Sequence, residues 1–188
     1  MKTIILEGIA TSGKSTITNL LIKALPTSLR ILVKDESSTH VPIMEDIGDT
    51  HVDFFKNLIL EASRQQVDVI IFDRLYVTQA FRSKSNLNHY AEVDEVLLPI
   101  NPMTILLKVD EMAVANRVAG AAVHRDPSWR EYLSTKGGNI DDVASYYIEQ
   151  QRSLIELIRQ SKIPYKIFDT TNHDYAGIVT YLQDFIKV

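Results

Sequence analysis

The chain alternates short apolar runs with stretches in which apolar residues recur at helical spacing. The runs are rich in Ile, Val and Leu and are typical of strands buried on both faces of a parallel sheet. They cover residues 4–6, 29–33, 67–72, 102–109 and 163–168. Because helices separate these runs, the pattern predicts an α/β fold: a doubly wound, five-stranded parallel sheet between two helical layers.

Prolines and polar residues mark where the intervening helices begin and end. The first helix is expected to end near Leu25, because Pro26 disfavours helical geometry in the residue before it. Residues 50–53 form a variant of a capping box that opens a second helix. Asp141 and Asp142 start a long helix with a wide apolar stripe, which is expected to pack on the sheet.

Length and composition limit the classes of protein. With 188 residues, 45% hydrophobic and 23% charged, the chain has the makeup of a single globular domain over 1–188. A net charge of −4 with scattered Lys and Arg argues against nucleic-acid and membrane-surface partners, and the lack of Cys excludes disulfides. No apolar stretch is long enough for a signal peptide or a membrane span. We therefore expect a cytoplasmic protein, as a monomer or a homodimer.

A glycine-bounded loop directly follows the first apolar run. Residues 8–15 fit the pattern G-x-x-x-x-G-K-[ST], preceded by a predicted strand and followed by Ile17, Leu20 and Leu21 at helical spacing. Glycines let several backbone N–H groups curl around a phosphate, and the helix that follows adds its positive end. The nucleotide-binding loop is predicted to comprise Gly8, Ile9, Ala10, Thr11, Ser12, Gly13, Lys14, Ser15 and Thr16.

Lys14 and Ser15 carry the chemistry of this loop. Lys14 would place a mobile positive charge on the terminal phosphates of ATP, and the Ser15 hydroxyl is suited to a Mg²⁺ ion at the start of the helix. Asp73 ends the apolar run 67–72 and would reach the same metal, directly or through water, with capping of the next helix as its alternative role. Ser15 and Asp73 are therefore the predicted metal-binding residues.

Charged residues follow two of the predicted strands on the side where ligands bind in parallel sheets. Arg74 is well placed to hold an anionic or hydroxyl-bearing substrate, with a surface ion pair as the alternative. Asp35 and Glu36 follow the run 29–33 and are candidates for contact with the substrate, with a solvated loop as the alternative.

A lid is predicted over about residues 115–138. Arg117 lies on a helix over 112–122 that leads to Arg125, and residues 128–139 have little hydrophobic periodicity. Phosphoryl transfer needs cations over the moving phosphate and exclusion of water, which a short helical lid with arginines supplies. The alternative for Arg117 and Arg125 is a surface charge on the helix.

These motifs together resemble the P-loop nucleoside and nucleotide kinases, especially the thymidylate kinase and deoxynucleoside kinase branch. The resemblance rests on Glu7-Gly8 leading into the loop, Asp73-Arg74 with Thr78 beyond, the segment 115–125, and residues 168–171, in the order of the family. It implies the P-loop fold with strand order 2-3-1-4-5 and transfer of the γ-phosphoryl group of ATP to a nucleoside or nucleoside monophosphate.

The resemblance also implies roles for individual residues. Asp35 or Glu36 would contact the acceptor, acting as general base in deoxynucleoside kinases, while Arg74 would hold the acceptor. Arg117 and Arg125 would bind the transferred phosphoryl group. Near the adenine, the resemblance places the loop with Thr171, Asn172 and His173.

The chain departs from the family after the second strand. The relatives usually have Glu-Pro there, whereas this chain has Asp35-Glu36-Ser37, and the interior of the nucleotide-binding loop also differs. A kinase for another small hydroxylated metabolite is therefore the second interpretation. A nucleotide-binding switch or partner module is a third.

Overall fold

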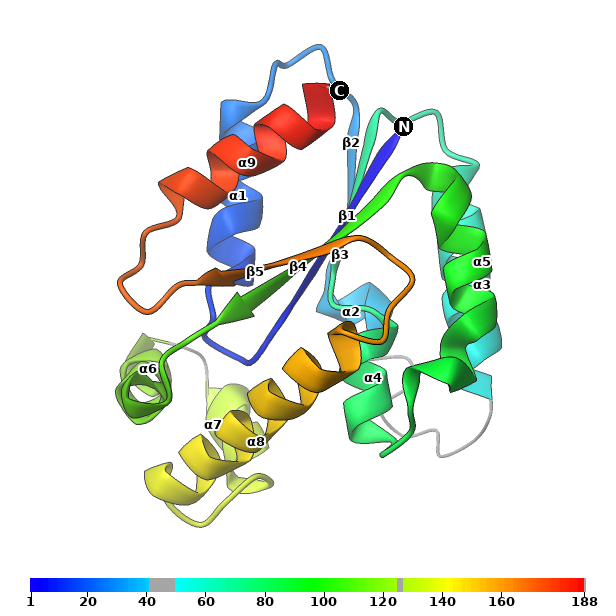
Figure 1. Cartoon of the computed structure of the whole chain (residues 1–188). Helices are drawn as coiled ribbons and strands as arrows, with labels where there is room; N and C mark the ends of the chain where they lie inside the picture. The colour runs from blue at the N-terminus through cyan, green and yellow to red at the C-terminus, as the bar shows by residue number, and fades with distance from the viewer. Residues whose placement is uncertain (41–49, 125–126, 188) are drawn as a thin grey trace.

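A computed structural model of the chain describes residues 1–40, 50–124 and 127–187 and contains one five-stranded parallel sheet. The strand order is β2-β3-β1-β4-β5, so the first strand lies at the centre and the predicted fold class and strand order are confirmed (Figure 1). The strands are β1 (Lys2–Gly8), β2 (Ile31–Lys34), β3 (Val69–Asp73), β4 (Pro102–Lys108) and β5 (Tyr165–Asp169).

Helices cover both faces of the sheet and its carboxyl edge. They are α1 (Lys14–Ala24), α2 (Glu36–Thr39), α3 (Thr50–Ser63), α4 (Tyr76–Arg82), α5 (Ala91–Leu97), α6 (Glu111–His124), α7 (Pro127–Ser134), α8 (Ile140–Ile158) and α9 (Ala176–Lys187). In Figure 1, α1 and α9 lie side by side on one face of the sheet and α3 and α5 on the other. Helix α1 contacts α9, and α3 contacts α5.

The alternation of side chains along β1 divides the core between the two faces. Ile5 packs with residues of α3, α4 and α5, whereas Ile4 and Leu6 pack with residues of α1 and α9. All three side chains are at most 1% exposed, as expected for a strand covered by helices on both faces. A further apolar cluster joins α6, α7 and α8 to the start of the glycine-rich loop through Ile9 and Ala10.

The register of the sheet brings the predicted site residues to one edge. Leu6 lies opposite Asp73, and Gly8 lies opposite Leu107. The backbone N–H of Arg74 donates to the carbonyl oxygen of Leu6 at 2.9 Å, which extends the pairing one residue past β3. The loop after β1 and the residues after β3 therefore share the carboxyl edge of the sheet.

The described strands differ from the predicted ones by one or two residues at most of their ends; β3, for example, covers 69–73 rather than 67–72. The second strand begins and ends later than the predicted 29–33, and the polar stretch after it forms the short helix α2 rather than a solvated loop. In the segment with little periodicity, residues 127–134 form α7, because Leu133 and Trp129 pack against α6 and α8. Two turns are too short for a repeating apolar pattern, so this helix leaves little trace in the sequence. Within the described part of the predicted lid, residues 115–124 and 127–134 are helical, and the mobility of the lid stays a prediction.

Across the described ranges, none of the helices combines the length and apolar character needed to cross a bilayer.

Candidate nucleotide and acceptor site

The two glycines of the loop are required by its backbone geometry. Gly8 has φ 144° and Gly13 has φ 101°, a region that side chains disfavour. A Cβ on Gly8 would lie 2.7 Å from the carbonyl oxygen of Leu107, and one on Gly13 would lie 2.6 Å from Cε1 of Tyr175. The glycines therefore let the loop curl tightly against its neighbours.

Lys14 folds back over this loop. Its amine donates to the carbonyl oxygens of Gly8 at 3.3 Å and Ile9 at 3.2 Å, and the residue is 7% exposed. Burial and the nearby charge of Arg74 lower the pKa of Lys14 to about 8. The amine is thus held at the loop by weak acceptors that an anionic ligand could replace.

Several polar atoms in the loop and next to it are buried and have no hydrogen-bond partner in the described part of the chain. They include Thr11 Oγ1, Ser12 Oγ and Asp73 Oδ1. Such atoms are costly in a folded protein and point to a ligand or ion that satisfies them.

A Mg²⁺ ion fits this donor set. No cluster of three or more His, Cys, Asp or Glu side chains that could hold a metal occurs within the described ranges. Mg²⁺ is usually bound by one or two protein oxygens together with waters and phosphate oxygens, so it does not need such a cluster. Ser15 and Asp73 both line the cavity beside the loop and would supply the protein oxygens.

A cavity of about 990 Å³ collects most of the predicted site residues. Those that line it are Ala10, Thr11, Gly13, Lys14, Ser15, Thr16, Asp35, Glu36, Asp73, Arg74 and Arg117. Gly8, Ile9 and Ser12 form the loop behind it, whereas Thr171 and Asn172 do not line it. Arg125 lies outside the described residues.

Glu36 lines this cavity and pairs with two arginines, of which Arg74 also lines it. Its Oε1 lies 3.4 Å from Arg74 Nε and 3.3 Å from Arg82 Nη2. Partial burial raises the pKa of Glu36, but Arg74 and its neighbouring cations outweigh this effect and hold the pKa below its ordinary value. Arg74 is 4% exposed, so the predicted surface alternative for this residue does not apply.

Asp35 uses its carboxylate differently. It accepts hydrogen bonds from the backbone N–H groups of Ser37 and Ser38 and caps α2. The Ser37 hydroxyl also donates to it, and this hydrogen bond lowers the pKa of Asp35. Of the two acidic candidates, Glu36 is therefore the one whose side chain meets Arg74.

Glu7 holds Arg74 in place from the central strand. Its Oε1 accepts from the N–H of Leu75 at 3.0 Å and of Thr78 at 3.4 Å, and its Oε2 accepts from Thr78 Oγ1 at 2.5 Å. Arg74 has φ 66°, a strained conformation for a residue with a side chain. The carboxylate thus caps the start of α4 and stabilises the turn that aims Arg74 at the cavity.

Arg117 reaches the cavity but is engaged with backbone carbonyls. Its guanidinium donates to Thr11 O at 3.0 Å, to Thr171 O at 3.1 Å and to Thr170 O. Its action on a phosphoryl group stays a prediction that requires these hydrogen bonds to be exchanged. Beyond β5, His173 and Tyr175 line the cavity.

The sequence did not single out the residues that α7 and α8 contribute. Tyr132, Tyr147 and Gln150 line the cavity opposite the loop. Tyr147 belongs to the apolar stripe of the long helix, and an aromatic residue in such a stripe is interpreted as part of the hydrophobic core. The available signal was a polar Gln150 on the same face, three residues further on.

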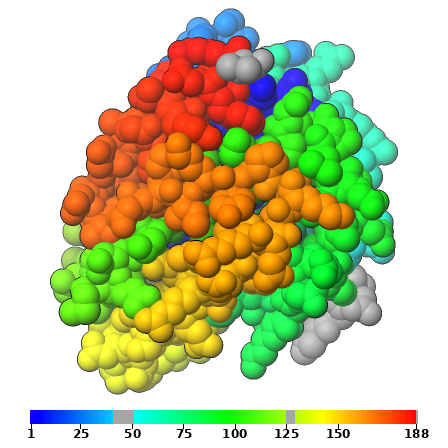
Figure 2. All heavy atoms as spheres, in the orientation of Figure 1, coloured from blue at the N-terminus to red at the C-terminus, as the bar shows by residue number. Residues whose placement is uncertain are grey.

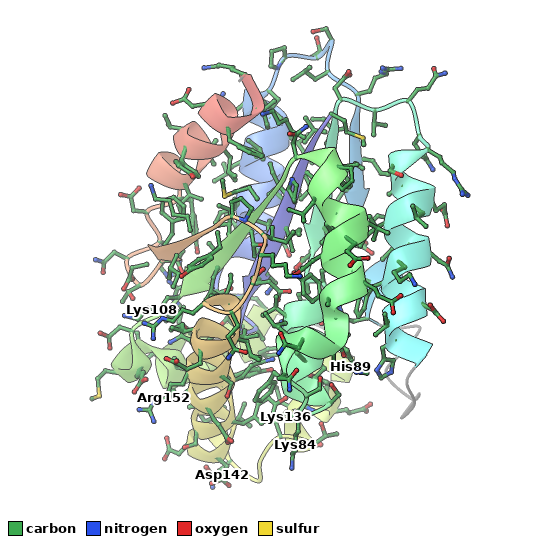
Figure 3. The ribbon with its side chains drawn as sticks, turned by 45° about the vertical axis from the view of Figure 1, so that its right-hand side comes forward. Lys84, His89, Lys108, Lys136, Asp142 and Arg152 are labelled. Carbon is green, nitrogen blue, oxygen red and sulfur yellow. The ribbon has the colours of Figure 1, made fainter. Side chains whose placement is uncertain are left out.

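A second hollow of about 1720 Å³ lies between α4 and the helices α7 and α8 (Figure 2). Lys84, His89 and Lys136 lie around it (Figure 3), and Lys136 Nζ lies 5.0 Å from the ring centroid of Tyr132. Tyr132 also lines the smaller cavity. Because no residue of the glycine-rich loop lines the larger hollow, the smaller cavity is the candidate site.

Solved structures with the same fold include shikimate kinases and a thymidylate kinase. The YorR protein from Bacillus subtilis, solved in complex with phosphorylated GDP, is 18% identical with a TM-score of 0.66 over 99% of this chain and 96% of that chain. Shikimate kinase from Bacteroides thetaiotaomicron is 16% identical with a TM-score of 0.59 over 100% and 99%. Thymidylate kinase from Candida albicans is 18% identical with a TM-score of 0.53 over 99% and 91%.

No protein-family model and no curated protein matches the sequence. The structural likeness is nevertheless spread over essentially the whole chain. The chain therefore has the fold of the P-loop kinases, as its motifs indicated.

Proposed function

We propose that this protein is an ATP-dependent phosphotransferase that transfers the γ-phosphoryl group to a nucleoside or a nucleoside monophosphate. The observation that carries the proposal is the placement of Lys14 and the Glu36–Arg74 pair in one cavity. A protein that only binds a nucleotide needs the loop and Lys14. It does not need a carboxylate–guanidinium ion pair in the same cavity.

Catalysis by these residues is positioning and charge neutralisation. Bound ATP with Mg²⁺ would supply the phosphoryl group and neutralise part of its charge. Lys14 would leave the carbonyls of Gly8 and Ile9 and bind the terminal phosphates. Ser15 and Asp73 would hold the metal.

Glu36 is the group that would handle a proton. If the acceptor is a hydroxyl, Glu36 would take its proton as the acceptor oxygen bonds to the γ-phosphorus of ATP, while the bond from that phosphorus to the bridging oxygen breaks and ADP leaves. Arg74 keeps the carboxylate ionised and oriented. An acceptor that is already a phosphate needs no such base. The pairing of Glu36 with both Arg74 and Arg82 leaves less free positive charge for a phosphate, and this favours a hydroxyl acceptor.

A second candidate is a kinase for another small hydroxylated metabolite. The likeness to shikimate kinase over the full chain favours it, together with the departure from Glu-Pro at Glu36-Ser37. A nucleoside and such a metabolite are both hydroxyl acceptors, so they predict the same use of Glu36.

Turnover of ATP against a panel of acceptors tests the proposal. The panel contains nucleosides, nucleoside monophosphates and shikimate, and the expected result is ATP consumption that depends on one acceptor class. The Lys14→Ala variant should be slower by on the order of 10²-fold or more, because it loses charge stabilisation in the transition state. ATP hydrolysis that no acceptor stimulates would instead support a nucleotide-binding switch.

A further inference from the structure

Two buried polar side chains of α8 face the candidate site without hydrogen-bond partners. Tyr147 is 1% exposed and Gln150 is 2% exposed, and both line the cavity. Tyr147 Oη and Gln150 Oε1 are buried atoms without a partner in the ranges that the structure describes. Unsatisfied buried polar atoms destabilise a fold, so their presence beside a cavity indicates a ligand that satisfies them.

The neighbouring residue of the same type shows that α8 is firmly placed. Gln151 donates from Nε2 to the carbonyl oxygen of Val109 at 2.8 Å and accepts from the Val109 N–H at 2.8 Å. Its amide group is thus fully used to fasten α8 to the end of β4. Gln150 is equally buried on the same helix, and it lies three residues from Tyr147 on one helix face. The open hydrogen-bonding capacity of both side chains is therefore presented to the cavity by a fixed scaffold.

Tyr147 and Gln150 line the same cavity as Glu36 and Arg74. Burial raises the pKa of Tyr147, with Tyr132 adding to the effect, Arg74 opposing it and Glu36 reinforcing it. The hydroxyl therefore stays protonated, and the charges that act on it include the Glu36–Arg74 pair. A neutral hydroxyl donor and a neutral amide therefore share the cavity with that pair.

We propose that Tyr147 and Gln150 bind a second hydroxyl group of the acceptor, one that is not phosphorylated. A hydroxyl accepts a hydrogen bond from Tyr147 Oη and donates one to Gln150 Oε1, so one group satisfies both. An ionised phosphate offers no proton to Gln150 Oε1, and an apolar group satisfies neither atom. This inference rests on the proposed kinase function and narrows the acceptor to a polyhydroxylated ring, such as the sugar of a nucleoside or a cyclic polyol.

Acceptor analogues that lack one hydroxyl test the inference. Each nucleoside that the wild-type protein phosphorylates, and shikimate if it is an acceptor, is compared with analogues that lack a single non-reacting hydroxyl. For the wild-type protein, loss of the bound hydroxyl should lower kcat/KM for the acceptor by about tenfold or more. In Tyr147→Phe and Gln150→Met, the intact acceptor should lose a similar factor and the analogue should lose little, with the KM for ATP unchanged.

Thermal unfolding without ligand gives a second readout that a structural role would not produce. Removing a polar atom that has no partner should leave the melting temperature unchanged or raise it by about 2–4 °C. If Tyr147 or Gln150 served only to stabilise the fold, both variants would melt earlier instead. Gln151→Met is the matched control, and its melting temperature should fall because the Val109 backbone groups lose their partners.

The outcomes separate this inference from the proposed function. Phosphotransfer with unchanged acceptor kcat/KM and unchanged discrimination in Tyr147→Phe and Gln150→Met would overturn the inference and leave the kinase function standing. Failure of every acceptor in the panel would remove both. Tyr146 lines the larger hollow instead, so the Tyr146→Phe variant should behave as the wild-type protein in all these measurements.

Discussion

At the scale of single residues, Lys14 is the group whose state depends most on the ligand. In the structure its amine is nearly buried, bound to two carbonyl oxygens and close to Arg74, and these surroundings lower its pKa to about 8. A triphosphate at the loop would reverse that effect, because negative charge beside an ammonium group raises its pKa.

Binding of a non-hydrolysable ATP analogue near pH 8 should therefore take up protons through Lys14. Free protein at this pH has lost part of the Lys14 charge, and the bound form regains it. Isothermal titration calorimetry in buffers of different ionisation enthalpy measures the uptake. Lys14→Arg stays charged at this pH and should lose it, whereas equal uptake by both proteins would contradict the assignment.

Asp73→Asn should raise the concentration of Mg²⁺ needed for half-maximal activity while leaving the fold intact. The buried Oδ1 of Asp73 has no protein partner among the described residues, so an amide of the same shape fits, but it loses the charge that attracts the metal. A Mg²⁺ titration of turnover, with circular dichroism as the check on folding, measures the effect. An unchanged metal dependence would count against Asp73 as a metal-binding residue.

At the scale of elements, Glu7 couples β1 to α4. The carboxylate accepts from Leu75 and Thr78, and it also fixes the strained turn at Arg74. Burial raises the pKa of Glu7 above its ordinary value of 4.5, even though the hydrogen bond from Thr78 lowers it. The same side chain thus supports the acceptor arginine and places an ionisable group in the core.

Glu7→Gln should gain stability relative to the wild-type protein as pH rises. A carboxyl group whose pKa is raised by folding keeps protons that the unfolded chain releases, so its contribution to the free energy of unfolding falls above the ordinary pKa of 4.5. Gln does not ionise and keeps an oxygen for the N–H of Leu75. Urea unfolding of both proteins at about pH 5 and about pH 8 measures their free energies of unfolding. If the free energy of unfolding of Glu7→Gln falls relative to that of the wild-type protein as pH rises, the pKa of Glu7 is not raised.

The sequence predicts whether a segment is a strand or a helix where its run of apolar residues fits only one of the two. Ile70 and Phe72 belong to a strand buried on both faces, so their pattern predicts β3 without reference to partners. Trp129 and Leu133 belong to no such pattern. Helix α7 is stabilised by the packing of these two residues against α6 and α8. Packing between distant elements decides such segments, and it leaves no local period.

The candidate site was predictable on the nucleotide side and less so on the acceptor side. The loop motif requires particular residues at fixed spacing, and its glycines occupy the backbone conformations that the motif implies. Asp35 and Glu36 were equivalent in the sequence, because only the fold shows that one caps α2 and the other meets Arg74. Gln150 and Gln151 were likewise indistinguishable until the contact with Val109 was known.

At the scale of the whole molecule, the layer of α6, α7 and α8 meets the glycine-rich loop that follows β1. Its apolar cluster includes Ile9 and Ala10 of the loop together with Trp129 of α7. A ligand at the loop therefore lies where this layer and the rest of the fold join.

Trp129 should report ligand binding, because it is the single Trp of the chain and lines the cavity. Addition of an ATP analogue, and then of an acceptor, should change the intensity or wavelength of its fluorescence. Trp129→Phe provides the blank. Saturable binding by calorimetry without any change in Trp129 emission would show that ligands leave α7 undisturbed.

Two of the contacts that surround the glycine-rich loop come from residues far along the chain. Gly13 rests against the ring of Tyr175, and the carbonyl oxygen of Ser12 accepts from Thr170 Oγ1 at 2.9 Å. A ribosome completes residues 8–15 more than 150 residues before it delivers these two partners. The nascent chain thus carries the whole motif long before it carries these two contacts, so a chain halted before β5 has the glycine-rich loop without two of the contacts that hold it in shape.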